Sequence, residues 1–501
     1  MRIKNHLFIL CFAALSGCAT VDFDTPREAS FAMDASESTT LKQTIEKWKE
    51  INPGPSGFYP LVDGTDALGA RLRLIEAAEK TIDAQYFLMK NDSAGQVFAS
   101  ALFAAADRGV RVRFLLDDIF TTVGDQAMTI IDGHPNIELR LYNPVSRTGI
   151  KGLNYLGDFS RANRRMHNKS FIVDNAAAVV GGRNIADEYF NLNQEGEFLD
   201  FDMLIFGEVS EALSVEFDRY WNHERSVPAE VVVGRISEQE LADFRNNLSR
   251  EKLESARKHY QEAFDSDLML SIGQQETRFY SADAIVITDD PDKLVTAIDV
   301  ENRLLVKALA EIVNEVTSEV VVMTPYFIPG KAGVDFWRSI VARGVRVVII
   351  TNSLAANNHT AVHSGYARYR KDIIRAGVEL FEARADAVAA EDKTMTMHTK
   401  AMIFDRESVF VGSLNLDPRS IAINSEMGVV VSSPEMTESL STRLFSNLPQ
   451  WTYRVTLNEQ GKLRWHANID GEEVVETKEP LASWWRRFSA WFLRIAPENQ
   501  L

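Results

Sequence analysis

Cysteine is almost absent from this sequence. The 501 residues include two cysteines, Cys11 and Cys18, both close to the N-terminus. A chain that loses residues 1–17 keeps a single cysteine and cannot form an internal disulfide. Stability must then come from a packed core. With 501 residues, 45% of them hydrophobic, the chain is long enough for roughly two to four domain-sized units.

An excess of basic residues is lacking as well. Lys and Arg total 54 against 71 Asp and Glu, which gives a net charge of −17. A protein that coats nucleic acid needs a broad basic surface. The composition therefore argues against a nucleic-acid partner, although it leaves room for a local basic groove.

Motifs that hold metals or nucleotides are also missing. The sequence contains no His-Glu-x-x-His, no paired Cys-x-x-Cys and no P-loop pattern. We therefore expect neither a metal nor another cofactor.

The N-terminus carries an apolar run that is too short to span a membrane. Basic residues precede the run over 7–15 and small residues follow it, as in a secretory signal. Leu-Ser-Gly-Cys at 15–18 resembles the cleavage box of bacterial lipoproteins, in which Cys18 becomes the acylated first residue. An uncleaved signal anchor is the alternative. We expect a lipid-anchored protein of the bacterial envelope that faces the periplasm, and its attachment to the inner or the outer membrane stays open.

A nine-residue pattern occurs twice. Residues 166–174 read MHNKSFIVD, and residues 397–405 read MHTKAMIFD. At the same spacing, each is followed by Gly-(Gly/Ser)-x-Asn, at 181–184 and 412–415. Two matches with identical spacing make a chance origin very improbable.

The correspondence between the halves extends upstream. RGVRV occurs at 108–112 and again at 343–347, and we match the Tyr-Phe pair at 86–87 to the one at 326–327. Such a shared linear plan indicates a tandem duplication.

Each half alternates strand and helix patterns, which predicts an α/β fold present twice. In the first half, TIDAQYFL reads as a strand, AGQVFASALFAAADRG as a helix and VRVRFLLDD as a buried strand. The expected order is a signal peptide (1–17), a lipid-anchored leader (18–55), a first α/β domain (56–227), a charged helical connector (228–290), a second α/β domain (291–455) and a C-terminal tail (456–501).

The histidine and lysine of each motif stand two residues apart. On a strand, His167 and Lys169 therefore project from one face, and so do His398 and Lys400. Asp174 follows His167 after seven positions, an odd step, and points to the other face or into the next turn. We expect it to brace the strand.

These residue types suit a phosphodiester. One neutral imidazole can attack phosphorus while the second protonates the leaving group, and the lysines with Asn184 and Asn415 supply donors for phosphoryl oxygens. A histidine nucleophile needs its second nitrogen held by an acceptor. Asp200 or its same-face neighbour Asp202 is the candidate for the first histidine, and Glu426 is the candidate for the second. Surface carboxylates at strand ends are the alternative interpretation.

The doubled His-x-Lys-x4-Asp with a downstream Gly-x-x-Asn resembles the signature of the phospholipase D superfamily. The resemblance covers nearly the whole chain after the signal. It implies two tandem α/β sandwich domains, each a mixed sheet flanked by helices, with the active site at their interface. It makes the two histidines the nucleophile and the general acid/base, favours His167 as the nucleophile, and adds Asp174 and Asp405 as the third motif residues. One departure, Gly182 where the second half has Ser413, indicates that the halves are not equivalent.

More narrowly, DFSRANRRMHNKSFIVD, VVGGRNIADEYF and VGSLNLDPRS resemble bacterial cardiolipin synthases of the C type. The implied function is a phosphatidyltransferase that makes cardiolipin from phosphatidylglycerol, with phosphatidylglycerol or phosphatidylethanolamine as co-substrate, through a phosphatidyl-histidine. A hydrolytic phospholipase D that releases phosphatidic acid and an envelope nuclease stay open as alternatives.

Two regions are candidates for lipid contact. LASWWRRFSAWFLRI, at 481–495, places its apolar side chains on one helical face, which is typical of a helix at the membrane interface. A helix packed on the core is the alternative. Candidate headgroup contacts, with plain surface roles as the alternative, are Arg164, Arg165, His363, Tyr366 and Arg368.

Overall fold

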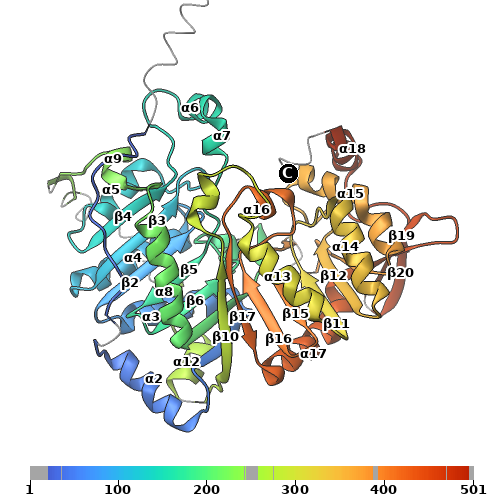
Figure 1. The fold of residues 1–501 in the computed structure, drawn as a ribbon, viewed down its shortest axis with the longest axis horizontal. Helices are drawn as coiled ribbons and strands as arrows, with labels where there is room; N and C mark the ends of the chain where they lie inside the picture. The colour runs from blue at the N-terminus through green and yellow to red at the C-terminus, as the bar shows by residue number, and fades with distance from the viewer. Residues whose placement is uncertain are drawn as a thin grey trace, which may run out of the picture.

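The structure of the protein is a computed structural model, drawn as a ribbon in Figure 1. It describes residues 21–495 except 35, 36, 194, 238, 242, 244–257, 275, 388–392 and 470. The predicted signal peptide (1–17), the predicted acylation site Cys18 and the middle of the predicted connector therefore lie outside the described residues.

The first half folds into one mixed sheet. Its strand order is β1-β8-β6-β5-β2-β3-β4-β9, in which β2, β3 and β4 run parallel and the other neighbours antiparallel. Parallel neighbours need crossover connections, which helices α4 and α5 supply. The strands are β1 (Ser56–Leu61), β2 (Thr81–Tyr86), β3 (Arg111–Asp117), β4 (Ile137–Tyr142), β5 (Ser170–Val173), β6 (Ala177–Gly181), β8 (Asp202–Gly207) and β9 (Ser226–Pro228).

The second half repeats this topology and extends it. Its order is β10-β17-β16-β15-β11-β12-β13-β18-β19-β20, with β11, β12 and β13 parallel. The strands are β10 (Tyr280–Thr288), β11 (Glu319–Met323), β12 (Arg346–Asn352), β13 (Glu379–Ala383), β15 (Ala401–Phe404), β16 (Ser408–Gly412), β17 (Met427–Ser432), β18 (Thr452–Leu457), β19 (Leu463–Ile469) and β20 (Glu472–Glu476). The last two strands have no counterpart in the first half.

Strands β1 and β10 pair with each other and join the halves into one 18-stranded sheet. The prediction of a helical connector is therefore wrong for 280–288, since this stretch is a full sheet strand. Its apolar and β-branched residues, YSADAIVIT, favour a strand, and the charged helical pattern before it obscured that signal.

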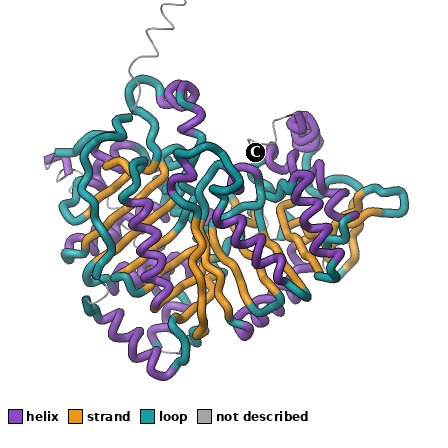
Figure 2. Tube along the Cα trace, in the orientation of Figure 1, coloured by secondary structure: helices purple, strands orange, loops and turns teal. Residues whose placement is uncertain are grey.

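Alternate residues of the strands face two different hydrophobic cores. On β8, Met203 and Ile205 enter a central core, whereas Leu204 enters the outer core of the first half. On β12, Val348 enters the same central core, whereas Val347 enters the outer core of the second half. The two halves therefore share a core, and β6 contacts β16 across it. Figure 2 shows the strands of the two halves as neighbouring sets with helices lying over them.

Helices cover both faces of each sheet, as predicted for the fold. Helices α3 and α4 pack in the outer core of the first half, α13, α14 and α15 in that of the second, and α8 and α17 in the central core. Their bounds are α2 (Thr40–Ile51), α3 (Gly64–Ala77), α4 (Ser93–Asp107), α5 (Asp125–Asp132), α6 (Lys151–Gly157), α7 (Phe159–Ala162), α8 (Glu208–Trp221), α9 (Ala229–Val233), α12 (Asp267–Gly273), α13 (Leu304–Glu315), α14 (Gly330–Ala342), α15 (Thr360–Arg375), α16 (Pro418–Ala422), α17 (Pro434–Trp451) and α18 (Trp484–Phe492).

The internal repeat is visible in the register of the strands. Each RGVRV stretch contains a glycine with positive φ, 95° at Gly109 and 90° at Gly344. This glycine ends a helix and lets the backbone turn into the next strand in each half. Isolated bridges pair Met89 with Ile185 in the first half and Phe327 with Leu416 in the second. Phe327 is therefore equivalent to Met89, and the match of 86–87 to 326–327 is wrong by two residues.

Asp174 and Asp405 hold the backbone at the ends of the motif strands. The Asp174 carboxylate accepts hydrogen bonds from the backbone N–H groups of residues 79–81, at 2.9–3.0 Å. Asp405 accepts the equivalent bonds from residues 317–319, at 2.8–2.9 Å. Both carboxylates thus tie their strand to the start of its sheet neighbour, in a supporting position.

The C-terminal helix α18 presents its aromatic side to solvent. Trp484, Trp485 and Trp491 are 61–68% exposed, whereas Ala490 of the helix and Ala482 just before it are buried in a small cluster with Leu354. The alternative of an aromatic face buried in the core is therefore wrong. Among the described helices, none has the length and apolar character needed to cross a membrane.

Candidate active site

The two repeated motifs meet across the interface of the halves. The backbone N–H of His167 donates to the Ser425 carbonyl at 3.0 Å, and the backbone N–H of His398 donates to the Leu199 carbonyl at 2.8 Å. A small parallel sheet of β7 (Gly196–Leu199) and β14 (Thr394–Met397) adds a second connection between the halves. Each motif therefore lies against a segment of the opposite half.

Each histidine is held by the acid of the opposite half. His167 Nδ1 lies 2.8 Å from Glu426 Oε2, and His398 Nδ1 lies 2.7 Å from Asp200 Oδ2. The expected pairing within each half is therefore wrong, although both acids are the predicted ones. The acids cross because the backbone of each motif histidine binds the opposite half, at Ser425 or Leu199. These two residues immediately precede Glu426 and Asp200.

Asp202, the competing candidate, holds no catalytic histidine. It is fully buried and forms ion pairs with Arg71 at 2.9 Å and with Arg183 at 3.5 Å. Arg71 in turn donates to the Tyr86 hydroxyl. Asp202 is therefore part of a buried polar network under the first sheet.

The two motif lysines are buried and turn towards their own histidines. Lys169 Nζ donates to the His167 carbonyl at 2.6 Å, and Lys400 Nζ donates to the His398 carbonyl at 2.5 Å. Burial lowers the pKa of Lys169 to about 7 and that of Lys400 to about 8. An anionic ligand would counteract this desolvation and keep both ammonium groups charged.

Both imidazoles have a pKa below the usual value for histidine and are therefore neutral. Burial and the neighbouring lysines hold the pKa of His167 well below its usual value and lower that of His398 to about 3. The Lys169 ammonium lowers the pKa of both histidines, so the two motifs lie within electrostatic reach of one another. His167, whose Nδ1–H is held by Glu426, presents the lone pair of its Nε2, whereas His398 Nε2 lies 3.1 Å from Lys400 Nζ.

The two orienting acids differ in charge. Burial would raise the pKa of Asp200, but its interaction with His398 and the charge of Lys400 lower it overall. Burial raises the pKa of Glu426 to about 7. Asp200 is therefore ionised at neutral pH, whereas Glu426 holds a proton more readily.

The Gly-Gly and Gly-Ser departure places different groups beside the two acids. The Ser413 hydroxyl donates to Glu426 Oε2, the same oxygen that holds His167. In the first half, a Cβ on Gly182 would lie 2.2 Å from Asp200 Oδ1, so glycine is needed for this carboxylate to fit. One half thus combines aspartate with glycine, and the other combines glutamate with serine.

The two asparagines also differ. Asn184 Oδ1 accepts the Leu88 N–H at 3.2 Å, and its Nδ2 donates to the Tyr189 hydroxyl at 3.1 Å. Asn415 is buried, and its Oδ1 has no hydrogen-bond partner within the described part of the chain. Its carboxamide is therefore the freer of the two to bind an incoming group.

The comparisons with known proteins agree with this geometry. Residues 72–221 and 309–448 match the family described as cardiolipin synthase, PLD-like domain, in which PLD denotes phospholipase D. The chain belongs to the phospholipase D superfamily. This confirms the predicted family and the prediction of two tandem α/β units.

Relatives from this superfamily cover most of the chain. Cardiolipin synthase C of Escherichia coli K12 is 37% identical over 461 residues, which cover 90% of this chain and 97% of that protein. Cardiolipin synthase of Oceanobacillus iheyensis is 24% identical over 403 residues, with coverages of 79% and 70%. Phosphatidylserine synthase of Haemophilus influenzae Rd KW20 has a similar fold, with a TM-score of 0.55, 14% identity and coverages of 82% and 91%.

The phospholipase D motifs are supported by residues that the sequence analysis missed. Asp117 ends β3 and accepts the Met166 N–H at 3.0 Å, and Asn352 ends β12 and accepts the Met397 N–H at 3.0 Å. Each thus holds the backbone of the methionine that immediately precedes a motif histidine. Their signal in the sequence was a polar residue at the end of the same buried strand in both repeats.

A buried ion pair supports Glu426. Asp289 Oδ2 accepts the Glu426 N–H at 3.2 Å and binds Lys293 Nζ at 2.7 Å. Aromatic rings hold the histidines from the side, since His167 lies 4.7 Å from the Phe87 ring and His398 stacks on Phe198 at 5.2 Å. No single-sequence signal pointed to these contacts.

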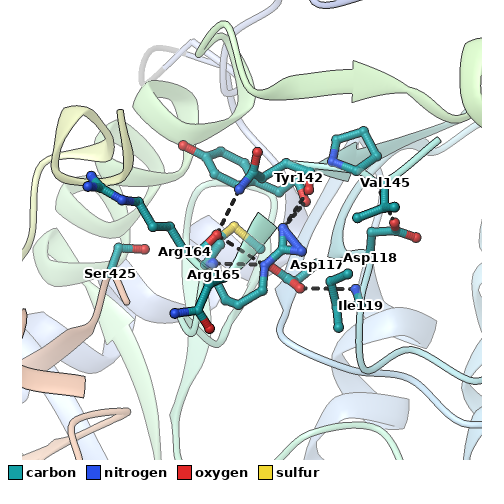
Figure 3. A network of polar contacts seen from close by, with 12 residues as sticks. Asp117, Asp118, Ile119, Tyr142, Val145, Arg164, Arg165 and Ser425 are labelled. Carbon is teal, nitrogen blue, oxygen red and sulfur yellow. Dashed lines mark hydrogen bonds and ion pairs between the residues drawn. The ribbon is translucent and has the colours of Figure 1, made fainter. Parts of the chain in front are cut away.

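Of the predicted headgroup contacts, Arg165 is enclosed. Figure 3 shows its guanidinium beside Asp117 and the backbone around Tyr142. It lies 3.3 Å from the Asp117 carboxylate and donates to the carbonyls of Tyr142 and Asn143. Arg164 donates to the carbonyls of Lys293 and Thr296. The prediction is therefore wrong for Arg165, which braces the loop before His167.

The candidates on α15 also face inward. Tyr366 is buried and donates to Glu382 at 2.7 Å, and His363 is buried 3.0 Å from Arg370 Nη2. Arg368 donates to the Arg494 carbonyl just after α18. His363 and Tyr366 thus belong to the packing of the second half, because helical spacing alone did not reveal which side of α15 faces the sheet.

Proposed function

We propose that this enzyme of the phospholipase D superfamily is a phosphatidyltransferase that makes cardiolipin from phosphatidylglycerol. The observation that carries the proposal is the crossed pair of neutral, buried histidines, each held by the acid of the other half. The likeness to cardiolipin synthases over most of the chain supports a phospholipid substrate.

In the first step, His167 Nε2 attacks the phosphorus of the donor lipid. Binding of the anionic phosphodiester raises the pKa of His398, which enters this step as an imidazolium. A P–N bond forms, the P–O bond to the headgroup breaks, and His398 gives its extra proton to the departing alcohol and becomes neutral. The lysines and asparagines of the motifs bind the phosphoryl oxygens. Asp174 and Asp405 take no part in proton transfer and keep the strands in place.

In the second step, the proton transfers run in reverse. His398 takes the proton of a phosphatidylglycerol hydroxyl, whose oxygen displaces His167 and yields cardiolipin. Phosphatidylglycerol or phosphatidylethanolamine serves as donor and releases glycerol or ethanolamine. Phosphatidylethanolamine cannot be the acceptor, because its headgroup has no hydroxyl. Water as acceptor would give phosphatidic acid.

The charges of the two acids favour His167 as the nucleophile. His398 must become an imidazolium and return to neutrality in each cycle, and the ionised Asp200 stabilises that cation. His167 needs only a fixed tautomer, which Glu426 Oε2 provides with the help of Ser413.

The proposal is tested by product analysis. The full-length protein is incubated with phosphatidylglycerol vesicles, with and without phosphatidylethanolamine, and lipids are identified by mass spectrometry. We expect cardiolipin with release of glycerol, and ethanolamine release when the second lipid is present. Phosphatidic acid as the main product would make the enzyme a hydrolase, and no turnover of either lipid would overturn the proposal.

We also propose that α18 lies at the membrane interface. Its exposed tryptophans and the arginines beside them match the composition of interfacial helices. Lipid acylation of Cys18 would anchor the periplasmic chain to the envelope, at the inner or the outer membrane.

Brominated phospholipid tests the position of α18. We expect such vesicles to quench the intrinsic fluorescence, because tryptophans at the interface contact the bromine atoms. Replacing Trp484, Trp485 and Trp491 by Leu keeps the apolar face and should remove most of the quenching. Trp48→Leu on α2, at the opposite edge of the molecule in Figure 1, is the control and should leave quenching unchanged. Full quenching in the triple variant would contradict the proposal.

A further inference from the structure

A second apolar segment, residues 150–159, stands out beside the active site. It comprises α6 and the start of α7. The exposed fractions of its four large apolar side chains, Ile150, Leu153, Leu156 and Phe159, are 41–67%. Helix α6 contributes no buried residue to a core. An amphipathic helix of a soluble protein ordinarily turns such side chains inward, and clustered exposure marks an interaction site.

The polar side of the segment fixes this outward orientation. Asn154 Nδ2 donates to the carbonyls of Ser146 and Thr148 at 3.0 and 2.7 Å. Lys151 Nζ lies 3.3 Å from the Asp118 carboxylate. These contacts tie α6 down by its polar residues, so the apolar side chains are held in solvent.

The segment leads directly into the catalytic motif. Asn163 follows α7, is buried, and binds the Arg419 guanidinium through its Oδ1 and its carbonyl, both at 2.8 Å. His167 comes four residues later, and the charge of Arg419 contributes to the lowered pKa of His167. Residues 150–159 therefore border the site.

Two other lipid-facing features share this edge of the molecule. Figure 1 shows α6, α7 and α18 along the same upper edge, with α16 between them. The described chain also begins here, with the Phe23 ring 4.9 Å from the Arg161 guanidinium of α7. Cys18 precedes Phe23 by five positions, a chain length of at most about 18 Å. A lipid on Cys18 would thus enter the bilayer close to residues 150–159.

We propose that residues 150–159 insert into a phospholipid bilayer together with α18, so that the bilayer faces the site between them. A donor lipid then presents its phosphate to His167 while its acyl chains remain in the membrane. The inference rests on the proposed function, because a lipid substrate is what such an orientation serves. The occupant of the apolar surface is the bilayer, and a second copy of the chain is the alternative to be tested.

Cysteine labelling tests the contact without using activity. Leu156→Cys is compared with Ile51→Cys, an exposed residue at the end of α2 on the opposite edge. Phosphatidylglycerol vesicles should slow maleimide labelling of Cys at 156 at least about tenfold and leave that at 51 unchanged, as read on the labelled peptides by mass spectrometry. Equal labelling with and without vesicles would overturn the proposal. So would protection that appears without vesicles and grows with protein concentration, because it would indicate a second copy.

Turnover tests the orientation. The Leu153→Ser/Leu156→Ser variant should lose at least about tenfold in turnover of vesicle-borne phosphatidylglycerol and keep its turnover of a soluble short-chain phosphatidylglycerol. Ile51→Ser is the matched control, with both rates unchanged. Equal losses on both substrates would overturn the proposal, because the segment would then act on the site itself. A wild-type protein that is inactive on both lipids, together with a Leu156→Cys variant that vesicles still protect from labelling, would overturn the proposed function and leave the membrane contact standing.

Discussion

Replacement of either catalytic histidine by alanine is expected to lower turnover by at least about 10⁴-fold. His167→Ala removes the proposed nucleophile, and His398→Ala removes the group proposed to move the proton in both steps. His466→Ala on β19 should keep wild-type turnover, because His466 bonds to Thr456 of β18 and pairs with Glu473 of β20, in the outer strands of the second half. Substantial turnover in either site variant would contradict the two-histidine mechanism.

A donor with a nitrophenol headgroup separates the roles of the histidines. Nitrophenolate leaves without a proton, so His398→Ala should still release one equivalent and stall with phosphatidyl on His167. His167→Ala should release none. The adduct is located by mass spectrometry of the peptides. An adduct on His398 in the His167→Ala protein would reverse the assignment. His167→Gln, which keeps a polar partner for Glu426, guards against loss of folding as the cause.

The repeat made much of the fold predictable from the sequence. The alternation of strands and helices occurs twice, and the order of the first eight strands agrees between the halves. The odd spacing of Asp174 from His167 also indicated its supporting position, which the hydrogen bonds to residues 79–81 now describe. These features depend on local periodicity, which a single sequence contains.

The pairing of each acid with the histidine of the opposite half could not be predicted from the sequence in the same way. Strand parity left Asp200 and Asp202 as alternatives on one face. The partner of Asp200 depends on how the two halves dock, which is a property of the shared core. The same limit applies to Arg165 and Tyr366. Their side chains suit a headgroup chemically, yet each is held in a buried network by residues distant in the sequence, Asp117 and Glu382.

Because each acid holds the histidine of the opposite half, replacing one acid should affect a different step than it would if each acid held the histidine of its own half. Asp200→Asn removes the charge that stabilises the His398 imidazolium, and its amide can hold the wrong tautomer. We expect overall turnover to fall about 10²–10⁴-fold. With the nitrophenol donor, this variant should keep a normal burst of one equivalent and then stall, because only the second step needs His398.

Glu426→Gln should give the opposite pattern, since Glu426 orients His167. The burst itself should slow, and Ser413→Ala should slow it by a smaller factor, roughly tenfold, because one hydrogen bond to the same carboxylate is lost. Glu435→Gln at the start of α17 is the same change outside the site and should leave both steps unchanged. If Asp200→Asn slowed the burst and Glu426→Gln spared it, each acid would serve the histidine of its own half. The assignment of Asp200 to His398 and of Glu426 to His167 would then be wrong in solution.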